Sequence, residues 1–205
     1  PAFQMTSVSF PWFQIMETEY YAPMADALSS TGLKSEATIV MRAAGYVPFM
    51  TQFSHVDSVG LTDNYLSGRK PISLIEREQY IWSKHPDIYI GPELPASAGA
   101  TDCASEPLIN SEYVQHILLH DNGTNLQLAT LHIYKNTTQQ ERCEALHARM
   151  RELRENWDLV GRLSMPLPAT KGEKIFAFVR RASPHHEQLT KALKTLVSSR
   201  LRGES

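Results

Sequence analysis

The chain has 205 residues, of which 42% are hydrophobic and 20% charged, a composition typical of a globular protein with a substantial core. Its net charge is −2 and the charges are interspersed, which argues against a nucleic acid as partner because phosphate binding needs clustered cations. No stretch approaches the ~18 consecutive apolar residues of a membrane span. The length favours one domain with additional segments.

The first segment, residues 1–16, is apolar and aromatic, and it begins on Pro1 rather than Met. We interpret it as a lead segment that follows a removed membrane span in a processed or truncated chain. The remaining residues, 17–205, are predicted to form a single α/β domain.

Helices and short strands alternate in the amino-terminal half. The hydrophobic pattern predicts, in chain order, a helix over 17–30, strands over 37–41 and 55–59, a helix over 73–84 and a strand over 88–90. The second helix has one apolar face opposite its charges, formed by Leu74, Ile75, Ile81 and Trp82. This order predicts parallel strands with right-handed crossovers.

The carboxyl-terminal half begins with a predicted loop or flap over 92–111. Two alternating runs, 113–120 and 126–134, flank an Asp-Asn-Gly turn and predict a hairpin. The capping box of Thr138 and Glu141 opens a helix. Its predicted apolar stripe comprises Cys143, Leu146, Met150, Leu153 and Trp157.

The chain closes with a predicted strand over 174–181 and a helix capped at Ser183 and Pro184. The last helix is expected to face inward with Leu189, Leu193, Leu196 and Val197. Together the elements predict an α/β fold. Its mixed sheet has a parallel βαβ amino half and an antiparallel, hairpin-bearing carboxyl half, with helices packed on the sheet.

Ligands of open α/β sheets bind outside the carboxyl ends of the parallel strands. The candidate ligand-binding residues after the first two strands are Arg42, Gly45, Tyr46, Asp57, Asp63 and Arg69. Two carboxylates at such an edge suit sugar hydroxyls or a divalent cation. The alternative is structural, with Asp57 tying down the turn and Asp63 capping a short helix after it.

Standard catalytic motifs are missing: the sequence has no nucleophile elbow, P-loop, dinucleotide-binding loop or H-E-x-x-H pair. We predict no cofactor, no metal and no catalytic residue. His116 and His120 lie about 13 Å apart on a strand, too far for one metal, and His185 and His186 are expected to be solvated. The two cysteines, Cys103 and Cys143, allow one disulfide or two free thiols.

Residues 17–92 resemble a segment of polytopic C-type membrane glycosyltransferases, of the arabinofuranosyltransferase and mannosyltransferase type. The residues that match are Ala44, Gly45, Pro48, Asp57, Gly60, Leu61, Asp63, Arg69, Pro86 and Asp87. The chain departs from that pattern after the proline, where Phe49 and Met50 replace the usual Tyr-Tyr or Tyr-Ser. Tyr46, Phe49 and Phe53 remain candidates for stacking on a sugar ring.

The resemblance implies a lipid-phosphate-linked sugar donor and catalytic carboxylates in a membrane domain that this chain does not contain. We therefore expect a non-catalytic domain at the periplasmic, extracytoplasmic face of a bacterial inner membrane. Its expected partners are its own transmembrane domain and a glycan acceptor or lipid-linked sugar. Two alternatives stay open: a purely structural packing domain, and a free-standing glycan or ester hydrolase that pairs Asp57 or Asp63 with His116 or His120.

Overall fold

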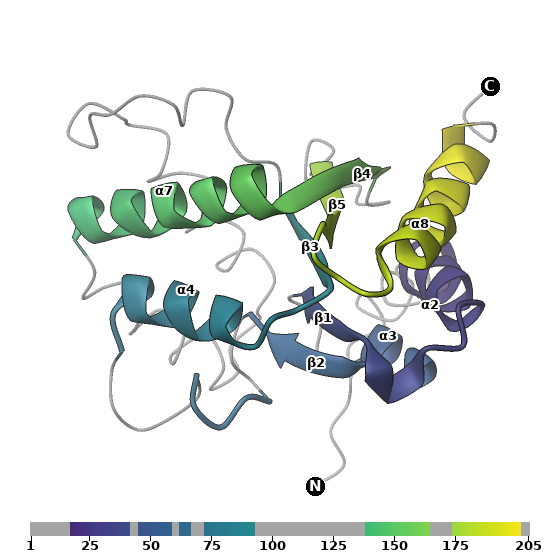
Figure 1. Ribbon diagram of the computed structural model, residues 1–205, viewed down its shortest axis with the longest axis horizontal. Coiled ribbons are helices and arrows are strands. Elements are labelled where there is room, and N and C mark those ends of the chain that lie inside the picture. The colour runs from purple at the N-terminus through teal and green to yellow at the C-terminus, as the bar shows by residue number, and fades with distance from the viewer. Residues whose placement is uncertain are drawn as a thin grey trace, which may run out of the picture. The chain divides into compact units, whose positions relative to one another are not determined.

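The computed structural model describes residues 17–41, 45–58, 62–66, 72–92, 138–164 and 174–201. A five-stranded mixed sheet in the order β2-β1-β3-β5-β4 organises the fold (Figure 1). The strands are β1 (Thr38–Met41), β2 (Ser54–Asp57), β3 (Ile88–Pro92), β4 (Trp157–Ser164) and β5 (Lys174–Arg180). β1 pairs in parallel with β2 and β3, whereas β5 is antiparallel to both β3 and β4. The predicted mixed α/β fold is confirmed.

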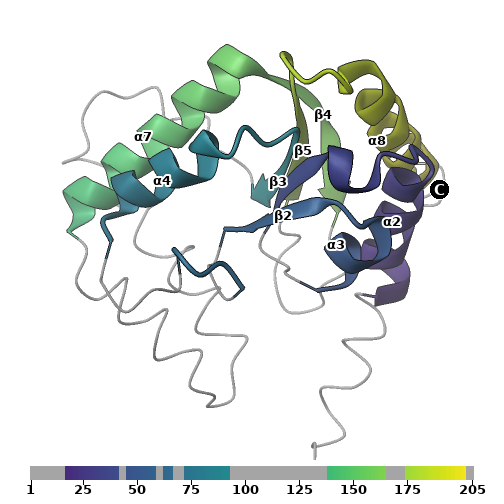
Figure 2. The ribbon, with the colours of Figure 1, turned by 60° about the horizontal axis from the view of Figure 1, so that its bottom comes forward.

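Helices α2 (Ala22–Ser29), α3 (Tyr46–Thr51) and α8 (His186–Leu201) lie on the same side of this sheet (Figure 2). Their buried side chains share one core with the inward residues of the strands, and that core includes Met24, Leu28, Val47, Ile39, Ile88, Val179, Leu189 and Leu193. α8 approaches β4 so closely that a Cβ on Gly161 would lie 2.8 Å from Val197. Glycine at this position therefore permits the helix to pack on the sheet.

The amino-terminal helix begins with one π-helical turn, Glu17–Tyr21, and continues as α2. Gly32 follows it with φ +71°, a left-handed conformation that glycine adopts at little cost. A short 3-10 helix, Lys34–Glu36, then leads into β1. The predicted helix over 17–30 and its stop are therefore confirmed.

Contacts divide the chain into two compact units. Residues within 1–58, 85–93 and 156–205 form the first, which holds the sheet, and residues within 59–84 and 94–155 form the second. The second unit contains α4 (Leu74–Ser83) and most of α7 (Gln139–Asn156), which lie side by side (Figure 1). The single domain over 17–205 stays a prediction.

α4 and α7 are joined by an ion pair between Glu78 and Arg149. The Glu78 side chain is 3% exposed and that of Arg149 is 14% exposed. The predicted arrangement of α4, with an apolar face opposite its charges, is wrong because Glu78 and Arg77 are buried. Of the four predicted core residues of this helix, only Ile81 is fully buried.

α7 starts at its capping box: Thr138 Oγ1 accepts from Glu141 N at 3.2 Å, and the Glu141 carboxylate accepts from Thr138 N at 3.0 Å. The helix then passes directly into β4, a strand that the sequence analysis did not predict. Trp157, assigned to the helical stripe, is the first residue of that strand and is buried.

Several predictions fall on residues outside the described ranges. These are the lead segment 1–16, the loop 92–111 beyond Pro92, the hairpin 113–134, and the residues Arg42, Arg69, Cys103, His116 and His120. In the described sheet, the antiparallel part is formed by β4 and β5.

Candidate functional site

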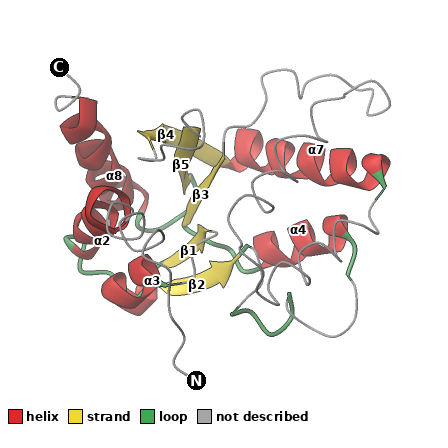
Figure 3. Ribbon diagram, turned by 180° about the vertical axis from the view of Figure 1, so that it is seen from behind, coloured by secondary structure: helices red, strands yellow, loops and turns green. Residues whose placement is uncertain are grey.

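The carboxyl ends of the parallel strands are the place where this topology predicts a ligand. β1 lies between β2 and β3 in the sheet. The chain first passes from β1 to β2 on one side and then returns to β3 on the other side, so the strand order reverses at β1. β1 and β2 lie side by side (Figure 3). Met41, the last residue of β1, pairs with Asp57, the last residue of β2. Gly45 precedes α3, and Tyr46 is its first residue. Asp57 therefore ends β2, and Tyr46 begins the helix that follows β1 in the chain.

Burial limits what each residue of this edge can contact. Asp57 is 1% exposed, so its carboxylate is not presented to solvent. Tyr46 is half-buried against the core, whereas Phe49, one turn further along α3, is 80% exposed. His55, on β2, contributes Nε2 at 3.3 Å from the Met41 carbonyl oxygen. The exposed aromatic side chain of α3 is therefore that of Phe49, whereas the Asp57 carboxylate is buried.

The two predicted carboxylates belong to different units: Asp57 to the first and Asp63 to the second. Asp63 Oδ1 accepts from the backbone N–H groups of Tyr65 at 2.9 Å and Leu66 at 3.0 Å. Its carboxylate also accepts from Tyr80 Oη at 3.0 and 3.2 Å. Asp63 thus accepts cap-type hydrogen bonds, as the structural interpretation predicted, but the segment that it caps is a turn over 64–66 and not the predicted short helix.

Asp87, another residue of the glycosyltransferase-like pattern, has a structural role at the opposite edge of the sheet. Its Oδ2 accepts from Thr38 N at 2.8 Å, and its Oδ1 accepts from Ser183 Oγ at 2.6 Å. Its own N–H donates to the Thr38 carbonyl at 2.8 Å, and its carbonyl accepts from Arg180 N at 2.9 Å. This buried residue thus links the start of β1, the start of β3 and the chain that enters α8.

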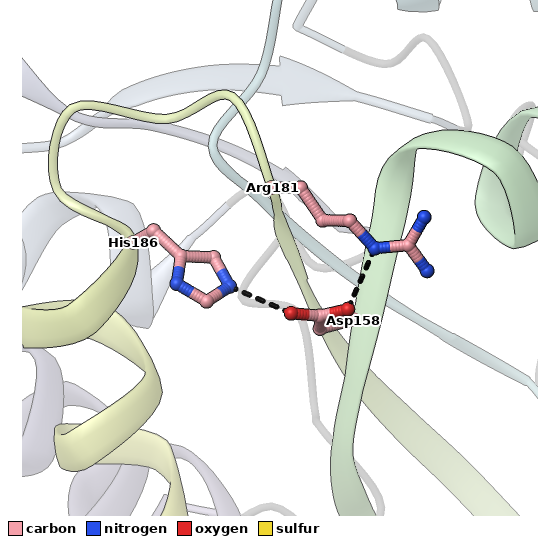
Figure 4. Close-up of polar contacts among 3 residues, drawn as sticks. All are labelled: Asp158, Arg181 and His186. Carbon is pink, nitrogen blue, oxygen red and sulfur yellow. Dashed lines mark hydrogen bonds and ion pairs between the residues drawn. The ribbon is translucent and has the colours of Figure 1, made fainter.

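A polar cluster that the sequence analysis missed joins β4, the end of β5 and the start of α8 (Figure 4). Asp158 accepts from Arg181 Nε through Oδ1 at 2.7 Å, and its Oδ2 lies 3.0 Å from His186 Nε2. Asp158 pairs with Val179 in the sheet, so it shares the face that α8 covers. His186 was expected to be solvated, but it is instead paired with this carboxylate.

The hydrogen bond from Arg181 has the largest effect on the pKa of Asp158 and holds it below its usual range. Burial opposes this shift, and the hydrogen bond from His186 lowers the pKa further. The carboxylate is consequently ionised at neutral pH and orients the imidazole. The doubled Arg180-Arg181 and His185-His186 pairs around Ser183 were the available signal, but their partner is 23 to 28 residues away.

An open cavity of about 560 Å³ lies along α8 beside His186. Most of its lining surface consists of apolar atoms, and the lining residues are His186, Glu187, Thr190, Lys191, Lys194, Thr195 and Ser198. Within the described ranges, His186 makes no hydrogen bond to a hydroxyl or thiol that it could activate as a nucleophile. The described side chains at this cavity therefore supply no catalytic pair.

In the part of the chain that the structure describes, no three His, Cys, Asp or Glu side chains gather as metal ligands. Cys143 is disulfide-bonded, with Sγ 3.8 Å from His147 Nε2. Cys103 is the only other cysteine of the sequence and lies outside the described residues. Among the described helices, none has the length and hydrophobicity required to cross a bilayer.

Comparison with known proteins gives one family. A family model with the description "Domain of unknown function (DUF8728)" matches residues 13–179. No curated protein and no solved structure matches the chain significantly.

Proposed function

The chain belongs to the DUF8728 family of domains of unknown function, and from this premise we propose that it is a non-catalytic, extracytoplasmic domain of a membrane glycosyltransferase. It binds or positions a glycan acceptor or a lipid-phosphate-linked sugar at the periplasmic face of a bacterial inner membrane. Its transmembrane partner carries the catalytic carboxylates. The proposal starts from the resemblance of residues 17–92.

One observation carries the binding role: the parallel strands β2, β1 and β3 have connections that diverge at β1. Such a point creates a crevice outside the carboxyl ends of the strands, where open α/β sheets bind ligands. Two of the residues that match the glycosyltransferase segment lie at this edge: Gly45 directly precedes α3, and Asp57 ends β2. The proposal assigns ligand contact to Tyr46 and Phe49 and a supporting role to the buried Asp57.

The carboxylate placement disfavours the hydrolase alternative. Asp63 is engaged in capping and in binding Tyr80, and Asp57 is buried. The histidines that this alternative needs, His116 and His120, lie outside the described residues. A catalytic pair therefore has no support from the described side chains.

A purely structural packing role is the second candidate, and one observation favours it. Phe49 and Met50 are neighbours on α3, and they are 80% and 47% exposed. Adjacent exposed apolar side chains are common at protein or membrane contacts. In this second role, α3 packs against an apolar surface of the transmembrane partner and does not bind a glycan.

Backbone NMR titrations separate the two roles. The probes are mannotriose, an arabinofuranose disaccharide, geranyl phosphate and micelles of lauryldimethylamine oxide. If the domain binds a sugar or the phosphate, we expect saturable shifts at residues 45–58. Phe49→Ala should then lower the affinity about two- to twelve-fold, because one ring contact is lost.

Shifts at α3 with micelles alone support the packing role and contradict the binding role. If no saturating probe shifts the signals of residues 45–58, both the binding role and the packing role are contradicted. Leu159→Ala, which shortens an exposed apolar side chain on β4, is the matched control and leaves all titrations unchanged.

A further inference from the structure

Two tyrosines of the second unit form a parallel stack. The rings of Tyr65 and Tyr80 have centroids 4.2 Å apart and planes inclined by 16°. Lys84 Nζ lies 4.5 Å from the centroid of Tyr80. Tyr80 therefore has an aromatic ring as one neighbour and a cation as another, while Tyr65 remains 44% exposed.

Hydrogen bonds hold both rings in place. Tyr65 Oη donates to Glu76 Oε1 at 2.8 Å, and Tyr80 Oη donates to the Asp63 carboxylate. Asp63 also accepts from the Tyr65 backbone N–H, so it ties together the turn and both members of the stack. The exposed ring is thus fixed before any ligand arrives, which lowers the entropic cost of binding.

The bond to Glu76 also sets the electronic character of Tyr65. It raises the pKa of this phenol, so the hydroxyl stays protonated and keeps donating to the carboxylate. A phenol that donates to an anion has an electron-rich ring, whose negative face attracts electropositive C–H groups. The ring edge is bordered by Glu76, whose exposed carboxylate has a second oxygen able to accept from a ligand hydroxyl.

We propose that the outer face of Tyr65 is a carbohydrate-stacking site, on which a sugar ring lays its C–H face while a hydroxyl donates to Glu76. This site lies in the second unit, whereas the edge described above lies in the first. It shares the ligand class of the proposed function and stands or falls independently of the edge.

Other ligands fit this surface less well. A flat electron-rich base would meet a ring of the same polarity, and an anion would meet the carboxylates of Glu76 and Asp63. A cation would be attracted by the ring face and by Glu76, but it has no hydroxyl to donate to the second oxygen of Glu76. A sugar uses the ring face and the acceptor at its edge together.

The test is a titration of the full chain with mannotriose, followed through the ring ¹³C–¹H signals of Tyr65 and the backbone signals of residues 62–66 and 72–84. We expect saturable shifts at these positions. Tyr65→Ala lowers the affinity about two- to twelve-fold, the range of one lost aromatic contact. Tyr65→Phe keeps the ring and most of the affinity, and Leu159→Ala is again the control.

Each outcome decides the matter. Shifts at 62–84 without shifts at 45–58 support the site and contradict the edge, and the reverse pattern overturns the site. Equal affinity in Tyr65→Ala overturns it as well. If Tyr65→Ala fails to fold, the wild-type ring signals still decide. Tetramethylammonium chloride that shifts these signals when mannotriose does not identifies a cation site and overturns the proposal.

Discussion

Glu78 and Asp158 both bind an arginine, but in different surroundings. In the second unit, Glu78 and Arg149 have side chains 3% and 14% exposed. In the first unit, Asp158 and Arg181 are 46% and 50% exposed, and His186 supplies a second donor. Buried ions lose their hydration and depend on each other, whereas exposed ions keep water as an alternative. Equal chemistry therefore predicts unequal contributions to stability.

The largest expected effect comes from removing one partner of the buried pair. Arg149→Met leaves the Glu78 carboxylate buried without its guanidinium, and we expect a loss of about 3–5 kcal/mol in the free energy of unfolding. Urea denaturation at pH 7 measures it, with hydrogen exchange of α4 and α7 amides locating the change. The double variant Glu78→Leu/Arg149→Met removes both charges and should recover most of the loss. A single-variant loss below about 1 kcal/mol would show that burial does not control this pair.

An intermediate effect is expected at Asp87, which is buried and whose carboxylate accepts from two neutral donors. Its two oxygens accept from Thr38 N and Ser183 Oγ. Asp87→Asn keeps the shape of the side chain, but the amide has only one oxygen and can accept only one of these two hydrogen bonds. We therefore expect a loss of about 1–3 kcal/mol in the free energy of unfolding.

The control at this position is Ser183→Ala, which removes one donor and spares the bond to Thr38; we expect it to cost less than Asp87→Asn. Both are measured by urea denaturation. If Asp87→Asn is neutral, the link between β1 and α8 contributes little, and burial alone does not rank these carboxylates.

Local patterns predicted the parts of the fold that local physics determines. The capping box of Thr138 and Glu141 needs residues three apart, and the inward face of α8 follows from spacings of three and four. Long-range partners were not predictable in this way. Glu78 meets Arg149 across 71 residues. It lies four residues from both Leu74 and Trp82, so it shares the predicted apolar face of α4, and the helical pattern alone does not identify the partner of its buried charge.

β4 was missed for a related reason. Trp157 extends the apolar stripe of α7 by one step, so the 3.6-residue pattern absorbed the first residue of the strand. The candidate edge of the parallel strands followed from the βαβ order, but the burial of Asp57 and the engagement of Asp63 depend on tertiary contacts that no short motif encodes.

The smallest expected effect belongs to the exposed cluster, and its pH dependence distinguishes it from the buried pair. The pKa of Asp158 is lower in the folded chain than in the unfolded chain, so its stabilising contribution is present above the unfolded value of about 3.9. The contribution is lost as the pH falls through the folded pKa. Because both ions are about half exposed, Asp158→Asn should cost no more than about 1 kcal/mol at pH 7, and less in 1 M NaCl. Urea denaturation of wild type and variant at pH 7 and at pH 2.5 tests this: the difference should shrink at the lower pH. A loss as large as that of Arg149→Met would contradict the comparison, because exposure would then not weaken the pair.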